Sequence, residues 1–204
     1  MPAATEIEGE ALEMKSANST WDRRGIALSA TVLAVTLLSL WLMGRIPICA
    51  CGTVKLWLGS GTSSETSQHL TDWYSLSHVI HGFLFFGALW LAARSWPPGN
   101  RLALAVAIEG AWEIFENTPF IIDRYRAQTV SLDYYGDSIV NSFGDLTAMI
   151  LGFLLASRQP VWLTVALAIA MEITAAFVIR DNLALNIIML LWPLDIIKEW
   201  QMGG

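Results

Sequence analysis

Ionisable side chains recur at helical spacing inside the apolar stretches of this sequence. His78 and His81 are three residues apart, so on a helix they share one face. Two other stretches repeat polar residues every three or four positions: Glu109, Glu113, Glu116 and Asn117 in one, and Asp137, Asn141 and Asp145 in the other. Ionisable groups are costly inside a bilayer, and this pattern therefore indicates a site with a function.

The depths of these residues agree. If successive apolar stretches cross a membrane in opposite directions, each residue can be counted inward from the same surface. The histidines, carboxylates and amides then fall about 5 to 10 residues deep, or roughly 8–15 Å at 1.5 Å per residue. We expect one polar layer below one surface of the membrane, to which Glu172 of a further stretch also contributes.

Two kinds of chemistry suit this layer. Histidines and carboxylates on facing helices are ligands for zinc, iron or manganese, and a divalent metal would be held by His78, His81 and Glu113. Carboxylates whose pKa is raised by burial can also act as acids or bases, and Glu113, Glu116 and Asp137 are the candidate catalytic residues. The motifs H-E-x-x-H and E-x-x-H are absent from the sequence.

A ligand-binding role is a third interpretation. Arg124 and Arg126 follow the glutamate-rich stretch and could hold the phosphate of a lipid-linked ligand, with Asn117 and Asn141 as further polar contacts. The alternatives are that the arginines are interfacial charges, and that the polar layer is a hydrogen-bonded network that joins helices. Charge-coupled transport ranks lower, because the sequence has no internal repeat.

The composition places the chain in a membrane. Of the 204 residues, 54% are hydrophobic and 15% are charged, whereas a soluble domain has about 25% charged residues. Ten Trp and four Tyr are typical of a protein with membrane interfaces. The net charge of −6 argues against nucleic acid as a partner, and the lipid bilayer is the expected surrounding.

The apolar stretches predict the fold class: an all-α integral membrane protein with a bundle of five transmembrane helices. A sixth C-terminal segment, 183–197, is short or kinked, because 15 residues rise about 22 Å and it contains Pro193. Residues 1–24 read as a mobile polar tail, and residues 25–201 as a single transmembrane helical domain. The five predicted spans are 26–44, 74–93, 102–122, 136–156 and 160–179.

The orientation follows from lysine and arginine near the span ends. Seven of them lie on the side of the N-terminus and five on the other side, which places the N-terminus in the cytoplasm. The polar layer then opens to the periplasm of a bacterial inner membrane. We expect residues 123–135 to form an ordered loop that covers the layer, with Arg124 or Arg126 turned inward to Asp137 or Glu116. Cys49 and Cys51 are expected to be two small interfacial residues rather than a redox pair.

Several long strings resemble a known family. E-G-A-W-E-I-F-E-N-T-P-F-I-I-D-R-Y-R (109–126) and L-D-Y-Y-G-D-S-I-V-N-S-F-G-D (132–145) are similar to an uncharacterised family of alphaproteobacterial multi-pass inner-membrane proteins, catalogued as a domain of unknown function. H-V-I-H-G-F (78–83) and I-R-D-N-L-A-L-N-I-I-M-L (179–190) resemble the same family. The resemblance implies a membrane location and no activity.

A shorter pattern resembles VanZ-like membrane proteins. The glutamate, basic loop and D-x-x-x-N-x-x-G of that group are similar to Glu113 or Glu116, the arginines, and Asp137-x-x-x-Asn141-x-x-Gly144. Asn117 stands where the group often has glutamine. This resemblance implies a role toward a lipid or peptidoglycan component of the envelope. Two function classes therefore remain: a protein that binds or processes an envelope amphiphile or a metal, and a non-catalytic subunit of a membrane complex.

Overall fold

The computed structural model describes residues 21–129 and 131–203, and this part of the chain is entirely helical apart from loops and one isolated bridge. Most of the predicted polar tail, residues 1–20, lies outside the described residues. The eight helices in the described part are α2 (Arg23–Leu42), α3 (Ser75–Ala92), α4 (Pro98–Glu116), α5 (Pro119–Gln128), α6 (Ile139–Ala156), α7 (Val161–Ile179), α8 (Leu183–Leu191) and α9 (Asp195–Met202).

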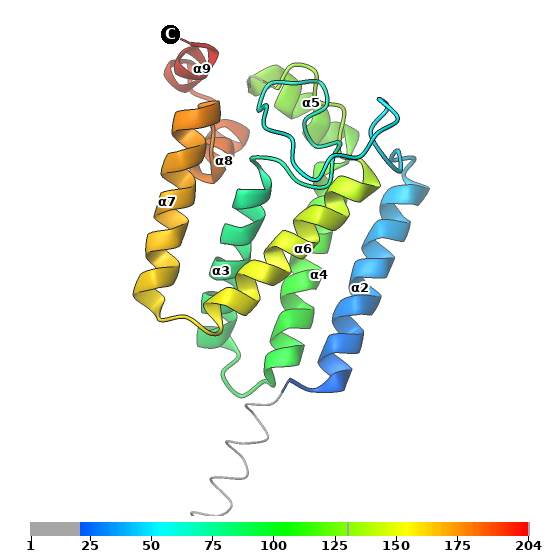
Figure 1. The fold of residues 1–204 in the computed structure, drawn as a ribbon, viewed down its shortest axis with the longest axis vertical. Coiled ribbons are helices and arrows are strands. Elements are labelled where there is room, and N and C mark those ends of the chain that lie inside the picture. The colour runs from blue at the N-terminus through cyan, green and yellow to red at the C-terminus, as the bar shows by residue number, and fades with distance from the viewer. Residues whose placement is uncertain (1–20, 130, 204) are drawn as a thin grey trace, which may run out of the picture.

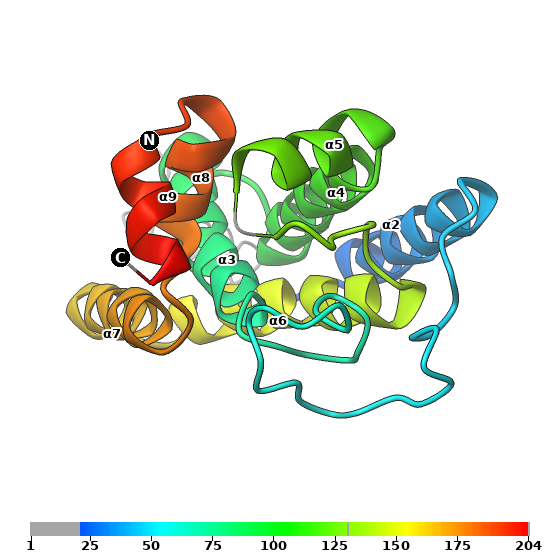
Figure 2. The ribbon, with the colours of Figure 1, turned by 90° about the horizontal axis from the view of Figure 1, so that it is seen from above.

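Of the five long helices, α2, α3, α4 and α7 run roughly along one axis and α6 crosses them obliquely, and the short helices gather at one end (Figure 1). Helices α5, α8 and α9 lie at the end where α2, α4 and α7 finish and where α3 and α6 begin. The view from above shows the loop between α2 and α3 at this same end, beside α6 (Figure 2). We call this end of the molecule the capped end. The all-α fold predicted from the sequence is confirmed.

Four helices are long and apolar enough to cross a membrane: α2, α3, α6 and α7. Their outward faces are strongly apolar, as in α7, where Val161 and Phe177 are 79% and 84% exposed. Helix α4 is of similar length, but it carries Arg101, Glu109, Glu113 and Glu116 and is therefore too highly charged to count as an apolar span. Its charged residues are consistent with a place inside the bundle, where Glu109 and Glu113 are buried.

Three predicted boundaries were wrong. The third span was predicted to continue to residue 122, but α4 ends at Glu116 and α5 begins at Pro119, a residue suited to the first turn of a helix. Residues 123–135 were predicted to be a loop, but α5 extends to Gln128. The fourth span begins at Ile139 rather than 136, because the Ser138 side chain caps α6 by accepting the backbone N–H of Asn141.

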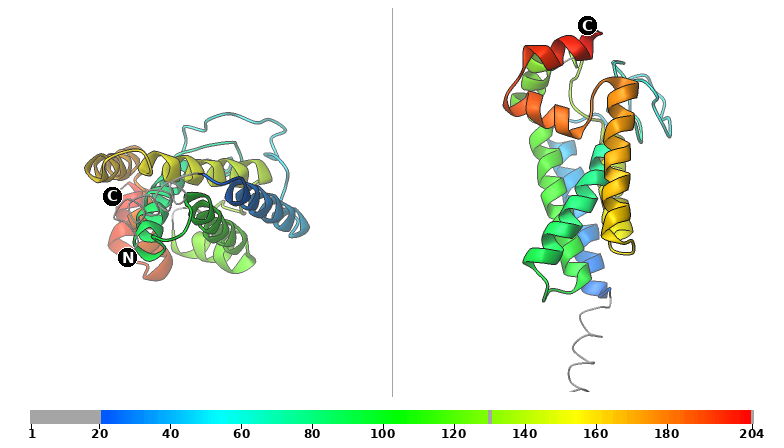
Figure 3. Two further views of the ribbon diagram at one scale, coloured as in Figure 1. Left: turned by 90° about the horizontal axis from the view of Figure 1, so that it is seen from below. Right: turned by 90° about the vertical axis from the view of Figure 1, so that its left-hand side faces the viewer.

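The C-terminal segment is divided at Trp192-Pro193-Leu194 into α8 and α9. The two helices have nine and eight residues, which rise only about 14 and 12 Å. Neither is long enough to cross a bilayer. The side view shows both helices turned across the capped end instead of continuing the bundle (Figure 3).

Helices α3 and α6 pack closely against each other, and this contact fixes their positions relative to each other. A side chain at Gly82 would collide with the Met149 carbonyl oxygen, and one at Gly152 would collide with the Val79 carbonyl oxygen. The two helix backbones therefore touch, as small residues allow inside membranes. Around this contact an apolar core of Val106, Leu146, Met149, Phe153 and their neighbours joins α3, α4 and α6.

Candidate functional site

Two histidines of α3 share one carboxylate of α4. His78 Nδ1 lies 2.5 Å from Glu109 Oε1, and His81 Nδ1 lies 3.0 and 3.1 Å from the two Glu109 oxygens. Glu109 is fully buried and His78 is 7% exposed. The predicted pairing of His78 and His81 on one helix face is confirmed, and the partner they meet is Glu109.

Two more carboxylates surround His78. Glu113 Oε1 lies 3.8 Å from His78 Nδ1, and Asp145 Oδ2 lies 3.8 Å from His78 Nε2. Asp145 also accepts a hydrogen bond from Ser75 Oγ at 2.9 Å. The ligand atoms of His78, His81 and Glu109 lie within 4.8 Å of one another, and so do those of His78, Glu113 and Asp145. His78 thus joins two groups that could each hold a metal ion, and we call these five residues the His78 cluster.

Glu113 has no hydrogen-bond partner. Both of its carboxylate oxygens are buried and unpaired, and the residue is 1% exposed. An unpaired buried carboxylate is costly, so such a group in a native protein calls for a proton or a cation. The neighbouring residues that could supply a positive charge are the histidines of the His78 cluster.

The His78 cluster borders a cavity of about 490 Å³, which is in the size range of small-ligand sites. Apolar side chains form one part of its wall: Phe85, Ile108, Trp112, Ile187 and Leu190. His78, His81, Glu109 and Asp145 form its polar floor. The cavity is therefore amphiphilic, with ionisable groups at one side and hydrocarbon at the other.

Glu116 and Asp137 also line this cavity, as predicted from their spacing. Asp137 is tightly held: Asn117 Nδ2 donates to it at 2.7 Å, Tyr134 OH donates at 3.1 Å, and its own backbone N–H donates to Asn117 Oδ1 at 2.8 Å. Asn117 thus positions Asp137 and does not itself line the cavity. Glu116 is half-buried and faces the same space.

The arginines take a different direction from the one predicted. Arg124 donates to the backbone carbonyls of Leu190 and Leu191, at the end of α8. Arg126 donates to the Tyr134 carbonyl at 2.5 Å and pairs with exposed Asp123 at 3.7 Å. The expected pairing with Asp137 or Glu116 is wrong, because both arginines donate to backbone carbonyls instead: Arg124 at the end of α8 and Arg126 in the loop after α5. Neither arginine is among the residues that line the cavity.

Asn141 is also placed outside the cavity. Its side chain donates to the His69 carbonyl at 2.9 Å, so it fastens the loop between α2 and α3 to the start of α6. Gln68 of the same loop donates to the Gly136 carbonyl at 2.7 Å. The structure therefore gives Asn141 a structural contact, and a ligand-binding role for it remains a prediction.

Residues 131–134 border the cavity from the capped end, together with 61–63 of the α2–α3 loop. The Tyr125 hydroxyl donates to Asn186 Oδ1 at 3.0 Å and joins α5 to α8. The described part of the predicted cover is thus joined to α8, and its role as an ordered lid stays a prediction. Residue 130 lies outside the described part.

Asp181, between α7 and α8, joins elements at the capped end by hydrogen bonds. It accepts hydrogen bonds from Tyr74 OH at 3.1 Å and from Gln201 Nε2 at 3.0 Å. Burial raises the pKa of Asp181 from 3.8 to about 6, against the opposing effect of its hydrogen bonds. Through these two contacts Asp181 connects α7, α9 and the start of α3.

Glu109 and Asp145 were not among the predicted site residues. Both lie on the predicted polar faces, Glu109 four residues before Glu113 and Asp145 four residues after Asn141. Helical spacing was the signal that could have included them. What it does not give is the rotation of α4, which brings Glu109 rather than Glu113 into direct hydrogen bonding with the histidines.

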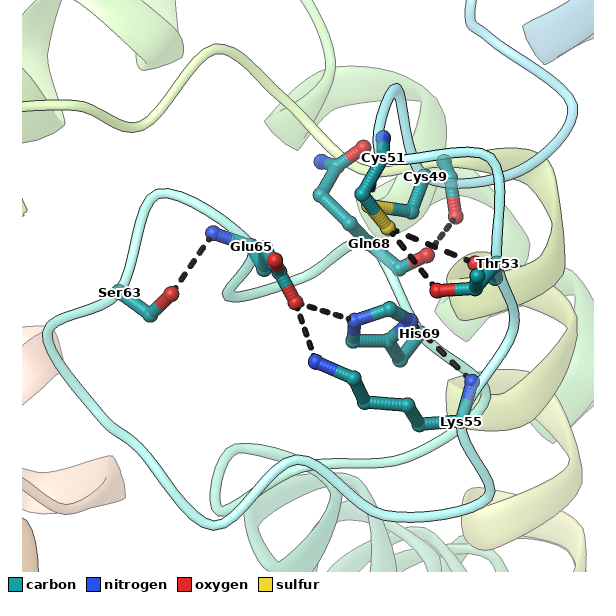
Figure 4. Close-up of a disulfide and its surroundings, with 9 residues drawn as sticks. Cys49, Cys51, Thr53, Lys55, Ser63, Glu65, Gln68 and His69 are labelled. Carbon is teal, nitrogen blue, oxygen red and sulfur yellow. Dashed lines mark hydrogen bonds and ion pairs between the residues drawn. A yellow bond between two sulfur atoms is a disulfide. The ribbon is translucent and has the colours of Figure 1, made fainter.

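Cys49 and Cys51 are joined by a disulfide, whereas two small interfacial residues were expected from the sequence. The bond lies in the α2–α3 loop, next to the ring of His69 (Figure 4). The loop places both cysteines at the capped end of the molecule.

Comparison with known proteins gives a family without an activity. Residues 40–203 match the family described as "Protein of unknown function (DUF2585)". The chain is 55% identical over 190 residues to a UPF0314 protein of Paracoccus denitrificans, covering 92% of this chain and 98% of that one. It is 58% identical over 172 residues to a UPF0314 protein of Rhizobium etli, and 59% identical over 172 residues to one of Rhizobium meliloti; these alignments cover 84% of this chain and 88% and 87% of those proteins. No solved structure matches.

Proposed function

Because the chain belongs to the uncharacterised DUF2585, or UPF0314, family of alphaproteobacteria, we infer its function from geometry, and we propose a metal-dependent membrane protein that acts on an envelope amphiphile. The metal is a divalent transition ion held by the His78 cluster. The amphiphile places its polar head in the cavity and its chain along the apolar wall.

The membrane topology in this proposal has five crossings. Helix α4 joins the four apolar helices because it runs alongside them (Figure 1) and its carboxylates face inward. Charged residues in a membrane helix are accommodated when they face the interior of a bundle or a polar cavity. Helices α5, α8 and α9 then lie at the membrane surface.

The observation that carries the metal is the unpaired carboxylate of Glu113 beside His78. Five buried or half-buried carboxylates lie in or around the cavity, Glu109, Glu113, Glu116, Asp137 and Asp145, and exposed Asp133 adds a sixth. No lysine or arginine of the described residues lines it. Only two histidines offset this charge, so a cation bound at the cluster would relieve the repulsion. Nitrogen and oxygen donors of this kind favour Zn²⁺, Fe²⁺ or Mn²⁺.

The remaining predicted site residues have roles around the metal. A bound divalent ion would polarise an ester or phosphate oxygen of the head group and thus serve as a Lewis acid. Glu116 and Asp137 line the same cavity and would transfer protons, and Asn117 and Tyr134 would orient Asp137. Arg124 and Arg126 do not line the cavity. In this proposal the metal, rather than these arginines, binds a phosphate of the head group.

The location supported by these features is the bacterial inner membrane, with the cavity facing the periplasm and the N-terminus in the cytoplasm. The charge bias at the span ends favours this direction. The disulfide at the capped end supports it independently, because disulfides persist in the periplasm and are rare in the cytosol.

The proposal can be tested by comparing two equivalent substitutions on α4. Glu113→Gln removes a carboxylate from the His78 cluster, whereas Glu116→Gln removes one from the adjoining cavity but outside both metal-ligand groups. We expect purified wild-type protein and Glu116→Gln to contain about one divalent metal per chain, and Glu113→Gln to lose most of it. Elemental analysis of the proteins in detergent, with thermal unfolding as a check on folding, gives the result.

Lipid mass spectrometry on the same preparations tests the amphiphile. A head-group class enriched in wild-type protein and depleted in a Trp112→Ala variant would support binding in the cavity. Wild-type protein free of metal and lipid, isolated in one stable complex, would instead support the non-catalytic membrane subunit.

A further inference from the structure

A second cluster of metal-ligand side chains lies outside the cavity, in the α2–α3 loop. The Cys49 and Cys51 sulfurs, a ring nitrogen of His69 and a carboxylate oxygen of Glu65 all lie within 4.8 Å of one another. Figure 4 shows the disulfide above the His69 ring and the Glu65 carboxylate beside one ring nitrogen. We call these four residues the loop cluster.

We propose that the loop cluster is a thiol-dependent metal site, closed when Cys49 and Cys51 form the disulfide and open to a zinc-like ion when they are reduced. Two thiolates, one imidazole and one carboxylate are a complete set of four ligands for Zn²⁺. The site uses none of the residues of the His78 cluster and does not depend on the proposed function.

The geometry is close to what an ion needs. In a tetrahedral zinc site with bonds of about 2.0–2.3 Å, the ligand atoms lie about 3.3–3.8 Å apart. The four atoms of the loop cluster are already within 4.8 Å, so His69 and Glu65 need only small shifts. The sulfur atoms move apart once their bond is broken.

His69 is held in place for this role. Its side chain is fully buried, and its backbone carbonyl accepts the hydrogen bond from Asn141 of α6. Nε2 lies 2.9 Å from Glu65 Oε2, and Nδ1 accepts from the Lys55 backbone N–H at 3.3 Å. In this tautomer Nε2 carries the ring proton and donates it to Glu65. To bind an ion through Nε2, the ring would transfer that proton to Nδ1 and give up the 3.3 Å bond from the Lys55 N–H.

The Lys55 ammonium now supplies the positive charge beside Glu65 that a bound ion would supply. The ammonium lies 2.5 Å from Glu65 Oε2 and is about half exposed. The hydrogen bond from His69 and the pairing with Lys55 lower the pKa of Glu65, which is therefore a carboxylate at neutral pH. When an ion binds, the Lys55 side chain can return to solvent.

Opening the site is a two-electron reduction. A dithiol reductant gives two electrons and two protons to the Cys49–Cys51 disulfide, which yields two thiols here and a disulfide in the reductant. Cys51 is the exposed partner and the accessible point of attack, whereas Cys49 is 3% exposed. Metal binding then releases the two thiol protons to water.

The experiment compares Zn²⁺ binding by the full-length protein in detergent, before and after phosphine reduction and anaerobic desalting. We expect reduction to add one Zn²⁺ per chain to whatever the oxidised protein binds. Cobalt added in place of zinc should give thiolate-to-cobalt absorption in the reduced protein alone. Because the count is a difference, it is the same whether or not the His78 cluster holds a metal.

Variants locate the added ion. His69→Gln and Cys51→Ser should lose it, whereas His81→Gln, a histidine change in the other cluster, should keep it. Lys55→Met should bind zinc up to about fivefold more tightly, since it removes a partly exposed competing charge. If His69→Gln does not fold, the exposed Cys51→Ser position still provides the test. Equal zinc binding before and after reduction, or an added ion that persists in Cys51→Ser, would overturn the proposal.

Discussion

At the scale of single residues, the polar side chains predicted from the sequence fall into two groups: those of the His78 cluster and those that hold loops in place. His78, His81 and Glu109 are directly bonded, and Glu113 is buried beside them without a partner. Asn141 instead makes a contact that holds a loop. In a purely structural network every buried polar group has a hydrogen-bond partner. Glu113 has none, and its carboxylate therefore requires a proton or a cation.

The raised pKa of Asp181 predicts how stability depends on pH. The folded protein keeps this carboxyl protonated up to about pH 6, whereas the unfolded chain loses the proton near 3.8. The folded state therefore binds more protons between these values, and stability should fall as the pH rises from about 4 to 6. The expected size is on the order of 2–3 kcal/mol.

Thermal unfolding in detergent across this range, for wild type and Asp181→Asn, measures the effect. The asparagine variant should lack this part of the pH dependence, so the difference between the two curves isolates Asp181 from other titrating groups. A difference that is constant from pH 4 to 7 would show that Asp181 ionises normally in the folded protein.

Helical spacing in the sequence was enough to place His78, His81, Glu116 and Asp137 in one polar layer, and in the structure all four line one cavity. It was not enough to direct the arginines, because Arg124 contacts carbonyls of α8, some 66 residues later in the chain. Contacts of that kind depend on how α8 folds back over α5. The periodicity of either segment contains no information on that arrangement.

At the scale of the elements, glycines set how closely helices approach. Gly82 and Gly87 both lie on α3, but only Gly82 faces a backbone, at the Met149 carbonyl of α6. Nothing in the structure lies within 4 Å of a side chain added at Gly87. The pair therefore separates helix packing from helix propensity.

Gly82→Ala should destabilise the protein by about 1–3 kcal/mol, because the methyl group forces α3 and α6 apart. Gly87→Ala should be neutral or stabilising by up to about 1 kcal/mol, because alanine favours the helix. Thermal unfolding of both variants in the same detergent provides the comparison. Equal effects would contradict the close contact between α3 and α6.

The α5–α8 contact explains why the predicted loop is partly a helix. Pro119 starts α5, and Arg124 and Tyr125 on it reach α8. The sequence contained the break at Thr118-Pro119, but the high hydropathy of the residues after it favoured a continued span. Proline at a first helical turn is a start signal as well as a stop signal.

Arg124→Met should loosen α8, because the carbonyls of Leu190 and Leu191 lose their donor. Hydrogen exchange should become faster in the backbone amides of α8, which report on local opening. Arg126→Met is the matched control, since its contacts lie within residues 123–134, and it should leave α8 unchanged. Similar exchange in both variants would mean that Arg124 does not secure α8.

At the scale of the whole molecule, the account requires five crossings and a C-terminus at the capped end. The break at Pro193 leaves α8 and α9 too short to span, so the chain ends on the side where α7 finishes (Figure 1). The hydropathy of 183–197 alone left a sixth crossing open. The structure separates the two cases because it divides the segment into helices of nine and eight residues.

Reporter fusions test this topology. Alkaline phosphatase fused after residue 203 and after 132 should be active, whereas a fusion within the turn between α3 and α4 should be inactive. The reciprocal pattern is expected with green fluorescent protein. Opposite results at 132 and 203 would establish a sixth crossing, and reversal of all three would reverse the orientation.

The central claim is that a metal ion binds at the His78 cluster, and X-ray absorption on the oxidised, purified protein tests it most directly. The disulfide removes the cysteine sulfurs as ligands in that preparation. We therefore predict a first coordination shell of nitrogen and oxygen alone, at about 2.0–2.2 Å for zinc, with the ring scattering of bound histidine. An absent metal, or a shell that contains sulfur, would contradict the account.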